Sequence, residues 1–230
     1  MSTAAAPMSD ATAPAGAALF VDVVSDVVCP WCYIGKRKLE AALARLREEP
    51  GLAVTVRWHP FELNPDLPAQ GMPRAAYLEA KFGGAARADE IYARVRAVGA
   101  EVDIPFAFER IRLQPNTLDA HRLITWAQAR GGADALVERL FRAYFTEGRY
   151  IGDVDELVAL AAEVGLPAGE SRTMLAADAY RGEVEAEFRE ARDAGISGVP
   201  FFIFNGRTAI SGAHDPETLL EAIAAARAKA

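Results

Sequence analysis

Cys29 and Cys32 are the only cysteines in the 230-residue chain, and they stand three positions apart in the motif CPWC. Two thiols at this spacing can carry out thiol–disulfide exchange, in which one thiolate attacks a disulfide and the other resolves the mixed disulfide. Pro30 follows Cys29, and proline is favoured at the first position of a helix. We therefore expect Cys29 at a helix N-terminus, as an exposed attacker whose thiolate is favoured by unpaired N–H groups. Cys32, one turn further in and shielded by the helix, is expected to resolve.

Zinc binding and inert burial are weaker interpretations of the cysteine pair. A zinc site needs about four ligands, and the remaining soft ligands in the sequence are three scattered histidines without paired spacing: His59, His121 and His214. We therefore predict no metal site. The cysteines could also be buried and inert, but a strand–CPWC–helix context is the one that redox chemistry requires.

The elements that position the motif are predicted to form a βαβ unit. Residues 18–24 (ALFVDVV) and 52–58 (LAVTVRW) are rich in β-branched and aromatic residues, which is typical of strands. The helix between them begins at Pro30, has one apolar face and ends at Pro50-Gly51. That face is formed by Leu39, Leu43 and Leu46. A parallel pair with a crossover helix places chemistry at the carboxyl ends of the strands, where Cys29 stands.

The middle of the chain changes character. Residues 61–73 and 100–116 contain several prolines and are predicted to be loops. Strand signals are absent from about residue 61 to residue 195, and helical periodicity recurs in this part of the chain. The predicted helices cover residues 74–98, 117–130, 134–146, 153–164 and 179–194.

The end of the chain returns to strands. Residues 201–204 and 208–210 flank Asn205-Gly206, the strongest short signal for a hairpin. Asp215 and Pro216 then begin a final helix. The order is βαβ, helical block, ββα. We predict an α/β thioredoxin-like domain (18–62 and 195–230), an all-helical insertion domain (63–194) and a disordered lead (1–17).

Composition restricts the functional class. The net charge is -7, 51% of the residues are hydrophobic and 25% are charged. A nucleic-acid partner is not expected, because phosphate binding needs clustered cations. Lys36, Arg37 and Lys38 are neighbours on the predicted first helix, but we expect them on a solvated face. The sequence shows neither an apolar run long enough to span a membrane nor a secretory signal, so we expect a cytoplasmic protein.

Four blocks of sequence resemble the DsbA-family oxidoreductases of the FrnE-like kind. They lie between positions 25 and 219 and therefore cover nearly the whole predicted folded chain. The resemblance implies a thioredoxin fold interrupted by a helical domain, in agreement with the order of elements. The blocks are SDVVCPWCYIGKRKLE, WHPFEL, QPNTLDAHRL and GISGVPFFIFNGRTAISGAHDPETL.

The resemblance also implies a cis-proline loop facing the cysteines, formed here by Val199 and Pro200. Without the family resemblance, we would expect Pro200 to be a trans proline at the start of an edge strand, because few X–Pro bonds are cis. If the bond is cis, the loop places Val199 beside Cys29. Its backbone would then bind an extended peptide by strand addition, with little side-chain specificity.

Further polar and aromatic residues are secondary candidates. Asp26 could assist proton transfer during resolution or cap a turn. Trp31 is expected to be exposed between the cysteines, where it could contact a substrate. His59, Asn116 and His121 could line a substrate groove between the domains, although packing, capping or a structural hydrogen bond explains each of them as well.

The leading functional hypothesis is a disulfide reductase or isomerase acting on protein or small-molecule thiols and disulfides. It needs no metal or organic cofactor, and glutathione could serve as co-substrate; we expect a monomer or homodimer. A second hypothesis is a glutathione-dependent isomerase of a small aromatic or polyketide-like substrate, since 2-hydroxychromene-2-carboxylate isomerases and kappa-class glutathione transferases share the fold. Those enzymes usually have serine where Cys29 stands. A third is a redox-linked chaperone that holds unfolded clients.

Overall fold

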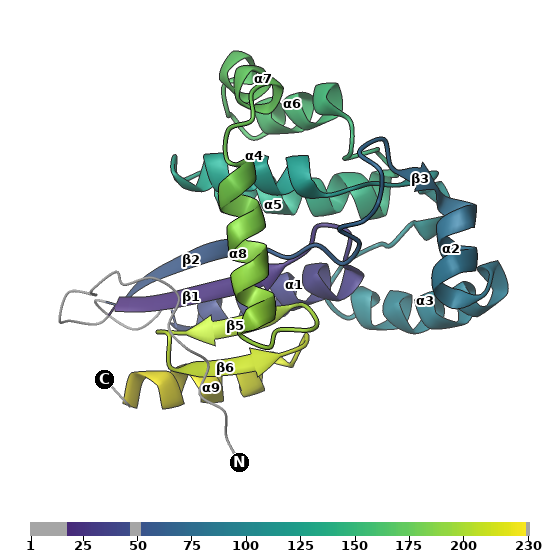
Figure 1. Ribbon diagram of the computed structural model, residues 1–230. Coiled ribbons are helices and arrows are strands. Elements are labelled where there is room, and N and C mark those ends of the chain that lie inside the picture. Colours follow the sequence, from purple (N-terminus) through teal and green to yellow (C-terminus); the bar gives the residue numbers. More distant parts are fainter. Residues whose placement is uncertain (1–17, 47–51, 229–230) are drawn as a thin grey trace.

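The computed structural model describes residues 18–46 and 52–228, and a mixed four-stranded sheet lies at its centre (Figure 1). The strand order is β2–β1–β5–β6. Strands β1 and β2 are parallel, whereas β5 runs antiparallel to β1 and β6 antiparallel to β5. This is the α/β thioredoxin-like arrangement that the sequence predicts. The strands are β1 (Ala18–Ser25), β2 (Ala53–Pro60), β5 (Phe201–Phe204) and β6 (Thr208–Ser211).

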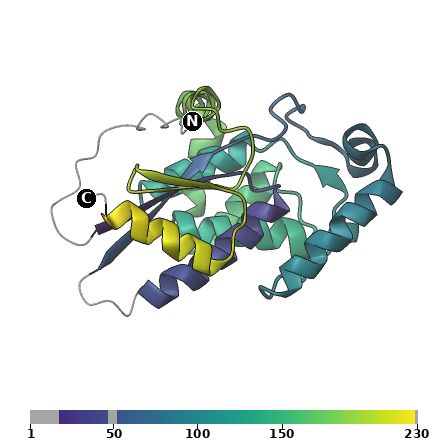
Figure 2. The same ribbon diagram turned by 90° about the horizontal axis from the view of Figure 1, so that it is seen from below.

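Strand β1 occupies the middle of the sheet because its side chains are buried on both faces. Leu19, Val21 and Val23 are fully buried, and so is Val24, which points to the opposite face. Helices α1 (Pro30–Leu46) and α9 (Pro216–Ala228) pack side by side beneath the sheet (Figure 2). Helices from the middle of the chain contact β2. The carboxyl end of β1 is thereby packed next to the start of α1.

The chain between β2 and β5 is mainly helical. Helix α8 returns from this region to the sheet and contacts both β2 and α4 (Figure 1). The helices are α2 (Arg74–Phe82), α3 (Ala85–Ala100), α4 (Leu118–Gln128), α5 (Ala133–Arg142), α6 (Val154–Glu163), α7 (Ala168–Ala176) and α8 (Arg181–Asp193).

Several local predictions for this middle block were wrong. The single helix predicted over 74–98 is broken at Gly83 and Gly84, whose φ angles of 76° and 120° favour glycine and end α2. Helix α7 was not predicted. The loops contain a 3₁₀ turn (Phe108–Arg110) and a two-residue ladder between β3 (Met72–Pro73) and β4 (Leu113–Gln114). The predicted lead 1–17 and the helix stop at Pro50-Gly51 lie outside the described residues.

The expectation of a solvated basic face on α1 was also wrong. Lys36 is only 2% exposed, and its ammonium group lies among the carboxylates of Glu40, Asp134 and Glu138. Lys38 is buried and donates to the Asp215 carboxylate just before α9. Helix α1 is covered by neighbouring elements on several sides, so these cations are buried in ion pairs instead of facing water.

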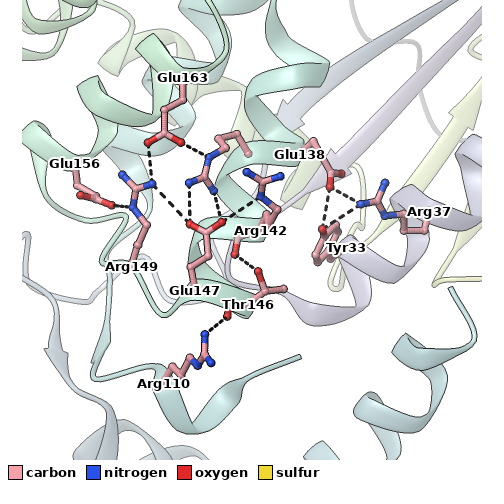
Figure 3. A network of polar contacts seen from close by, with 11 residues as sticks. Tyr33, Arg37, Arg110, Glu138, Arg142, Thr146, Glu147, Arg149, Glu156 and Glu163 are labelled. Atoms are coloured by element: carbon pink, nitrogen blue, oxygen red, sulfur yellow. Dashed lines mark hydrogen bonds and ion pairs between the residues drawn. The ribbon is translucent and has the colours of Figure 1, made fainter. Parts of the chain in front are cut away.

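A network of polar contacts holds the helical block together and ties it to α1 (Figure 3). Glu138 of α5 accepts hydrogen bonds from the Tyr33 hydroxyl, at 2.8 Å, and from Arg37 of α1. A second group of side chains joins α5, the π-helical turn after it and α6. Its ion pairs connect Glu147, Glu156 and Glu163 with Arg139, Arg142 and Arg149.

Candidate active site

Cys29 lies between β1 and α1, at the N-terminal end of the helix. Its carbonyl oxygen accepts hydrogen bonds from the backbone N–H groups of Cys32 and Tyr33, at 3.0 and 3.4 Å, so Cys29 opens the first turn. Cys29 and Cys32 are 3.5 Å apart and form no disulfide. They are 5% and 1% exposed, so the expectation of an exposed attacking sulfur at Cys29 was wrong: only a small part of this residue reaches the surface.

The loop before β5 covers Cys29. The Val199–Pro200 peptide bond is cis, as the family resemblance implies, and the Cys29 thiol donates to the Val199 carbonyl at 3.6 Å. Gly35 of α1 permits this close approach: a Cβ atom there would lie 2.9 Å from Pro200 Cγ. Because Gly35 has no side chain, Pro200 can pack directly on α1, and this packing keeps the cis-proline loop next to the Cys29 sulfur.

The two thiols lie in different environments. Burial raises the pKa of the Cys32 thiol well above its ordinary value, and the neighbouring Cys29 raises it further. The Ser25 side chain and the Asp26 backbone lower it in part. Cys32 is consequently held as a neutral thiol until something removes its proton. This environment suits a resolving cysteine, which reacts only after the other cysteine has formed a mixed disulfide.

Asp26, three residues before Cys29, is fully buried. Its carboxylate accepts from the backbone N–H groups of Val28, at 3.3 Å, and Leu63, at 2.8 Å, so it does shape the turn before Cys29. The structure also brings His121 of α4 to it, with 3.5 Å between His121 Nε2 and Asp26 Oδ1. Burial raises the pKa of nearby Glu62, and the Asp26 charge raises it further. Three ionisable groups thus gather beside the redox motif.

The remaining candidates do not join this group. Asn116 donates to the Leu67 carbonyl and accepts from the Leu118 N–H, both at 2.9 Å, so it anchors a loop and the start of α4. Pro30 begins α1, and Trp31 is half-buried against the core, not freely exposed. These side chains have structural surroundings that do not need a substrate.

His59 forms part of a separate ion-pair cluster on β1, β2 and α8. Its Nε2 lies 2.9 Å from Asp22 Oδ1, and its Nδ1 lies 2.9 Å from Glu187 Oε2. Burial lowers the pKa of His59, but hydrogen bonds to the two carboxylates outweigh this effect and raise the pKa from 6.5 to about 9. His59 is therefore a charged structural bridge at neutral pH.

We predict that this bridge makes folding stability depend on alkaline pH. The folded-state pKa lies above the unfolded value, so the stabilisation is fully present below pH 6.5 and is lost as the pH rises through about 9. The shift corresponds to about 3 kcal/mol of unfolding free energy. Urea unfolding between pH 6 and 10 should show this loss in the natural protein and a flatter profile in His59→Gln. His214→Gln is the control; equal slopes in all three proteins would contradict the prediction.

A surface groove of about 350 Å³ lies between the segment that follows β2 and the end of α8. Its walls include Phe61, Leu63 and Phe188, and Arg192 provides a cation. Leu63 connects this wall to Asp26 through its backbone hydrogen bond, and Ile196 on the same wall packs in one cluster with Val199. An extended chain lying in the groove would thus come close to the cis-proline loop.

Comparison with known proteins identifies the family. A model described as DSBA-like thioredoxin domain matches residues 20–224. The chain belongs to this DsbA-like family. The uncharacterized protein YwbO of Bacillus subtilis (strain 168) is 30% identical over 208 residues, which cover 88% of this chain and 94% of YwbO.

Solved structures of DsbA-like proteins share the fold. A probable DsbA oxidoreductase from Streptomyces coelicolor is 35% identical and has a TM-score of 0.82, with coverage of 92% of this chain and 91% of its own. The cytosolic disulfide reductase DsbM from Pseudomonas aeruginosa, solved with GSH, is 21% identical with a TM-score of 0.61, covering 91% of this chain and 96% of its own. At that identity DsbM supports the fold alone.

Within the described parts of the chain, no helix combines the length and apolar character that crossing a membrane requires. Across residues 18–46 and 52–228, no group of three or more histidine, cysteine or acidic side chains is arranged to hold a metal ion.

Two residues near the site, Ser25 and Glu62, were not predicted from the sequence. Ser25 lies next to Asp26, and its side chain reaches Cys32. Glu62 stands within the WHPFEL block, whose resemblance to the family was the available signal. Neither the contact of Ser25 with Cys32 nor the approach of Glu62 to Asp26 can be inferred without knowing how β2 and α4 pack on β1.

Proposed function

We propose that this DsbA-like protein is a dithiol–disulfide oxidoreductase in which Cys29 attacks and Cys32 resolves. The observation that carries the proposal is the asymmetry of the pair. Cys29 opens α1 under the cis-proline loop, whereas Cys32 lies 3.5 Å away in a more buried environment. A sulfur at a helix N-terminus reacts readily as thiolate, and a shielded thiol next to it can release the bound partner.

The proposed reaction proceeds through two exchanges. The Cys29 thiolate attacks one sulfur of a substrate disulfide, whose S–S bond breaks, and the other substrate sulfur leaves as a thiolate. Cys32 then loses its proton and attacks the Cys29 sulfur of the mixed disulfide. The Cys29–Cys32 bond forms and the second substrate sulfur leaves. The substrate gains two electrons and the protein loses them; two molecules of a thiol such as glutathione then reduce the Cys29–Cys32 bond to the dithiol and leave as a disulfide.

The proposed direction of the reaction, reduction or oxidation, and the proposed partners follow from a cytoplasmic location. In a reducing cytoplasm the dithiol is the resting form, so reductase or isomerase work is favoured over oxidation. The groove beside Val199 is partly apolar and suits an extended polypeptide, whose backbone can pair with the cis-proline loop. We propose protein disulfides and small disulfides as substrates, with glutathione as co-substrate and no metal or organic cofactor.

Trapping the mixed disulfide tests this function. Cys32→Ala keeps the attacking sulfur but removes the resolving one, so expressed protein should carry client proteins or glutathione attached through Cys29. Non-reducing electrophoresis and mass spectrometry would identify the adducts, with Cys29→Ser/Cys32→Ala as the matched control. If the two variants carry the same background, the redox assignment fails and the isomerase hypothesis gains support.

A further inference from the structure

A second groove lies between α2, α3 and the 3₁₀ turn, in the part of the chain that forms one end of the molecule (Figure 1). Its volume is about 350 Å³, within the range of roughly 300–1,000 Å³ that small-molecule sites occupy. Apolar side chains, among them Leu78, Phe108 and Ile111, form much of its wall, and Arg74 and Arg112 line it as well. The lining includes neither cysteine and no residue of the cis-proline loop, so this groove is separate from the redox site.

Arg74, the first residue of α2, is a buried cation whose partners are all neutral. It is 9% exposed, and its guanidinium donates to Gln114 Oε1 and to the Tyr92 hydroxyl, the latter at 2.5 Å. The Tyr144 hydroxyl lies 3.5 Å away. Across residues 18–46 and 52–228, no carboxylate lies within ion-pair distance of Arg74. Buried charges are normally paired, because an isolated charge in a protein interior is strongly disfavoured.

The aromatic neighbours of Arg74 do not supply the missing negative charge. The rings of Tyr77 and Tyr92 have their centroids 5.1 and 5.5 Å from the guanidinium carbon, a favourable but weak arrangement. Burial raises the pKa of Tyr77, Tyr92 and Tyr144, and the charge of Arg74 offsets this only in part. These phenols therefore stay neutral at neutral pH, and the charge of Arg74 is not balanced.

The cluster around Arg74 also holds more hydrogen-bond donors than acceptors. A guanidinium carries five N–H groups, and the acceptors that they reach are Gln114 Oε1 and two tyrosine hydroxyls. Gln114 Oε1 also accepts from the Tyr144 hydroxyl at 3.0 Å, which fixes the orientation of the amide. The buried Gln114 Nε2 has no partner among the described residues. An additional acceptor with negative charge would correct both the charge and the excess of donors.

The rest of the groove is also weakly positive. Helix α2 follows Pro73 without a side-chain cap and has no acidic residue in its first turn, so the helix itself does not neutralise its positive end. Arg96 pairs with Glu109 at 3.6 Å, whereas Arg112 has no ion-pair partner in the part of the chain that the structure describes. Asp89 is the other carboxylate of the lining, so three arginines stand against two acidic residues.

We infer that this groove binds a small organic anion, whose phosphate or carboxylate group pairs with Arg74 and whose apolar part packs against Leu78 and Phe108. The planar guanidinium fork suits such groups, because it can donate two parallel hydrogen bonds to them. Arg112, which is exposed, provides a second cation for the same group. The inference adds a binding site to the protein and does not depend on the proposed redox function.

Isothermal titration calorimetry with phenyl phosphate and with benzoate tests this site, because each probe joins an anionic group to an apolar ring. The natural protein should bind at least one of them saturably, with one molecule per chain, and more tightly than inorganic phosphate. The probe with the higher affinity then identifies the anionic group. Arg74→Lys keeps the charge but loses the planar fork, so it should weaken binding by about tenfold.

Two further variants separate loss of binding from loss of folding. Arg112→Gln alters an exposed side chain without an ion pair and should weaken binding by about three- to tenfold. Arg172→Gln, which removes an exposed cation elsewhere, is the matched control and should bind within about twofold of the natural protein.

Three results would overturn the inference. These are no saturable binding of either probe, unchanged affinity in both Arg74→Lys and Arg112→Gln, and loss of binding in Cys29→Ser, which would place the anion at the redox site. Because the titrations measure binding alone, their outcome is independent of whether the protein reduces disulfides.

Discussion

Cys29→Ser should reduce insulin-disulfide reduction to the uncatalysed background. A serine hydroxyl at a helix N-terminus is not appreciably ionised near pH 7, so the attacking thiolate disappears and no mixed disulfide forms. Loss of a nucleophile commonly lowers turnover by roughly a thousandfold or more. The turbidity assay with glutathione or dithiothreitol as reductant measures this loss directly.

The variant should fold normally, because serine is close to cysteine in size and can also donate to the Val199 carbonyl, as the Cys29 thiol does at 3.6 Å. An unchanged thermal midpoint with lost activity would assign the effect to chemistry. Cys32→Ser provides the matched comparison, since it should retain the first exchange and lose the second. Full insulin reduction by Cys29→Ser would contradict the mechanism, whereas retained client holding without reduction would support the chaperone alternative.

The features that the sequence predicted correctly depend on local signals. The strand–CPWC–helix arrangement follows from apolar β-formers before Ser25 and from Pro30 at the start of α1. The final hairpin follows from Asn205-Gly206, both of which have positive φ. The redox pair and its place at a helix start could therefore be inferred from a few neighbouring residues.

The features that were missed depend on packing between distant segments. Lys36 appeared to be a surface cation, because nothing local reveals that α5 brings Asp134 and Glu138 to it. Asp26 and His121 were candidates for separate reasons, yet their meeting requires α4 to lie on the sheet. The exposure of Cys29 was overestimated because the loop at Val199 covers it from 170 positions away in the sequence.

Arg122 shows how much of the helical block depends on one buried side chain. It is only 2% exposed, and its guanidinium donates to the Asp119 carboxylate at 2.7 Å. The other N–H groups serve carbonyl oxygens at the end of α7 and in the turn leading to α8. Those acceptors are the carbonyls of Met174, Leu175, Ala177 and Ala179.

We predict that Arg122→Met destabilises the protein by about 3–5 kcal/mol. Methionine fills much of the volume but donates no hydrogen bond, so several carbonyl groups and Asp119 lose their partner at once. Urea unfolding should show a lower midpoint, and Arg122→Lys should fall between the variant and the natural protein because lysine keeps the charge without the planar fork.

The control is another arginine in an ion pair, Arg172, whose guanidinium pairs with Asp155 at the surface. Both side chains are more than half exposed, so Arg172→Met should cost less than about 1 kcal/mol. Equal losses of unfolding free energy in Arg122→Met and Arg172→Met would mean that only the removed charge affects stability. A much larger loss at Arg122 would show that satisfying buried carbonyls holds α4, α7 and the start of α8 together, and α8 leads directly to the cis-proline loop over Cys29.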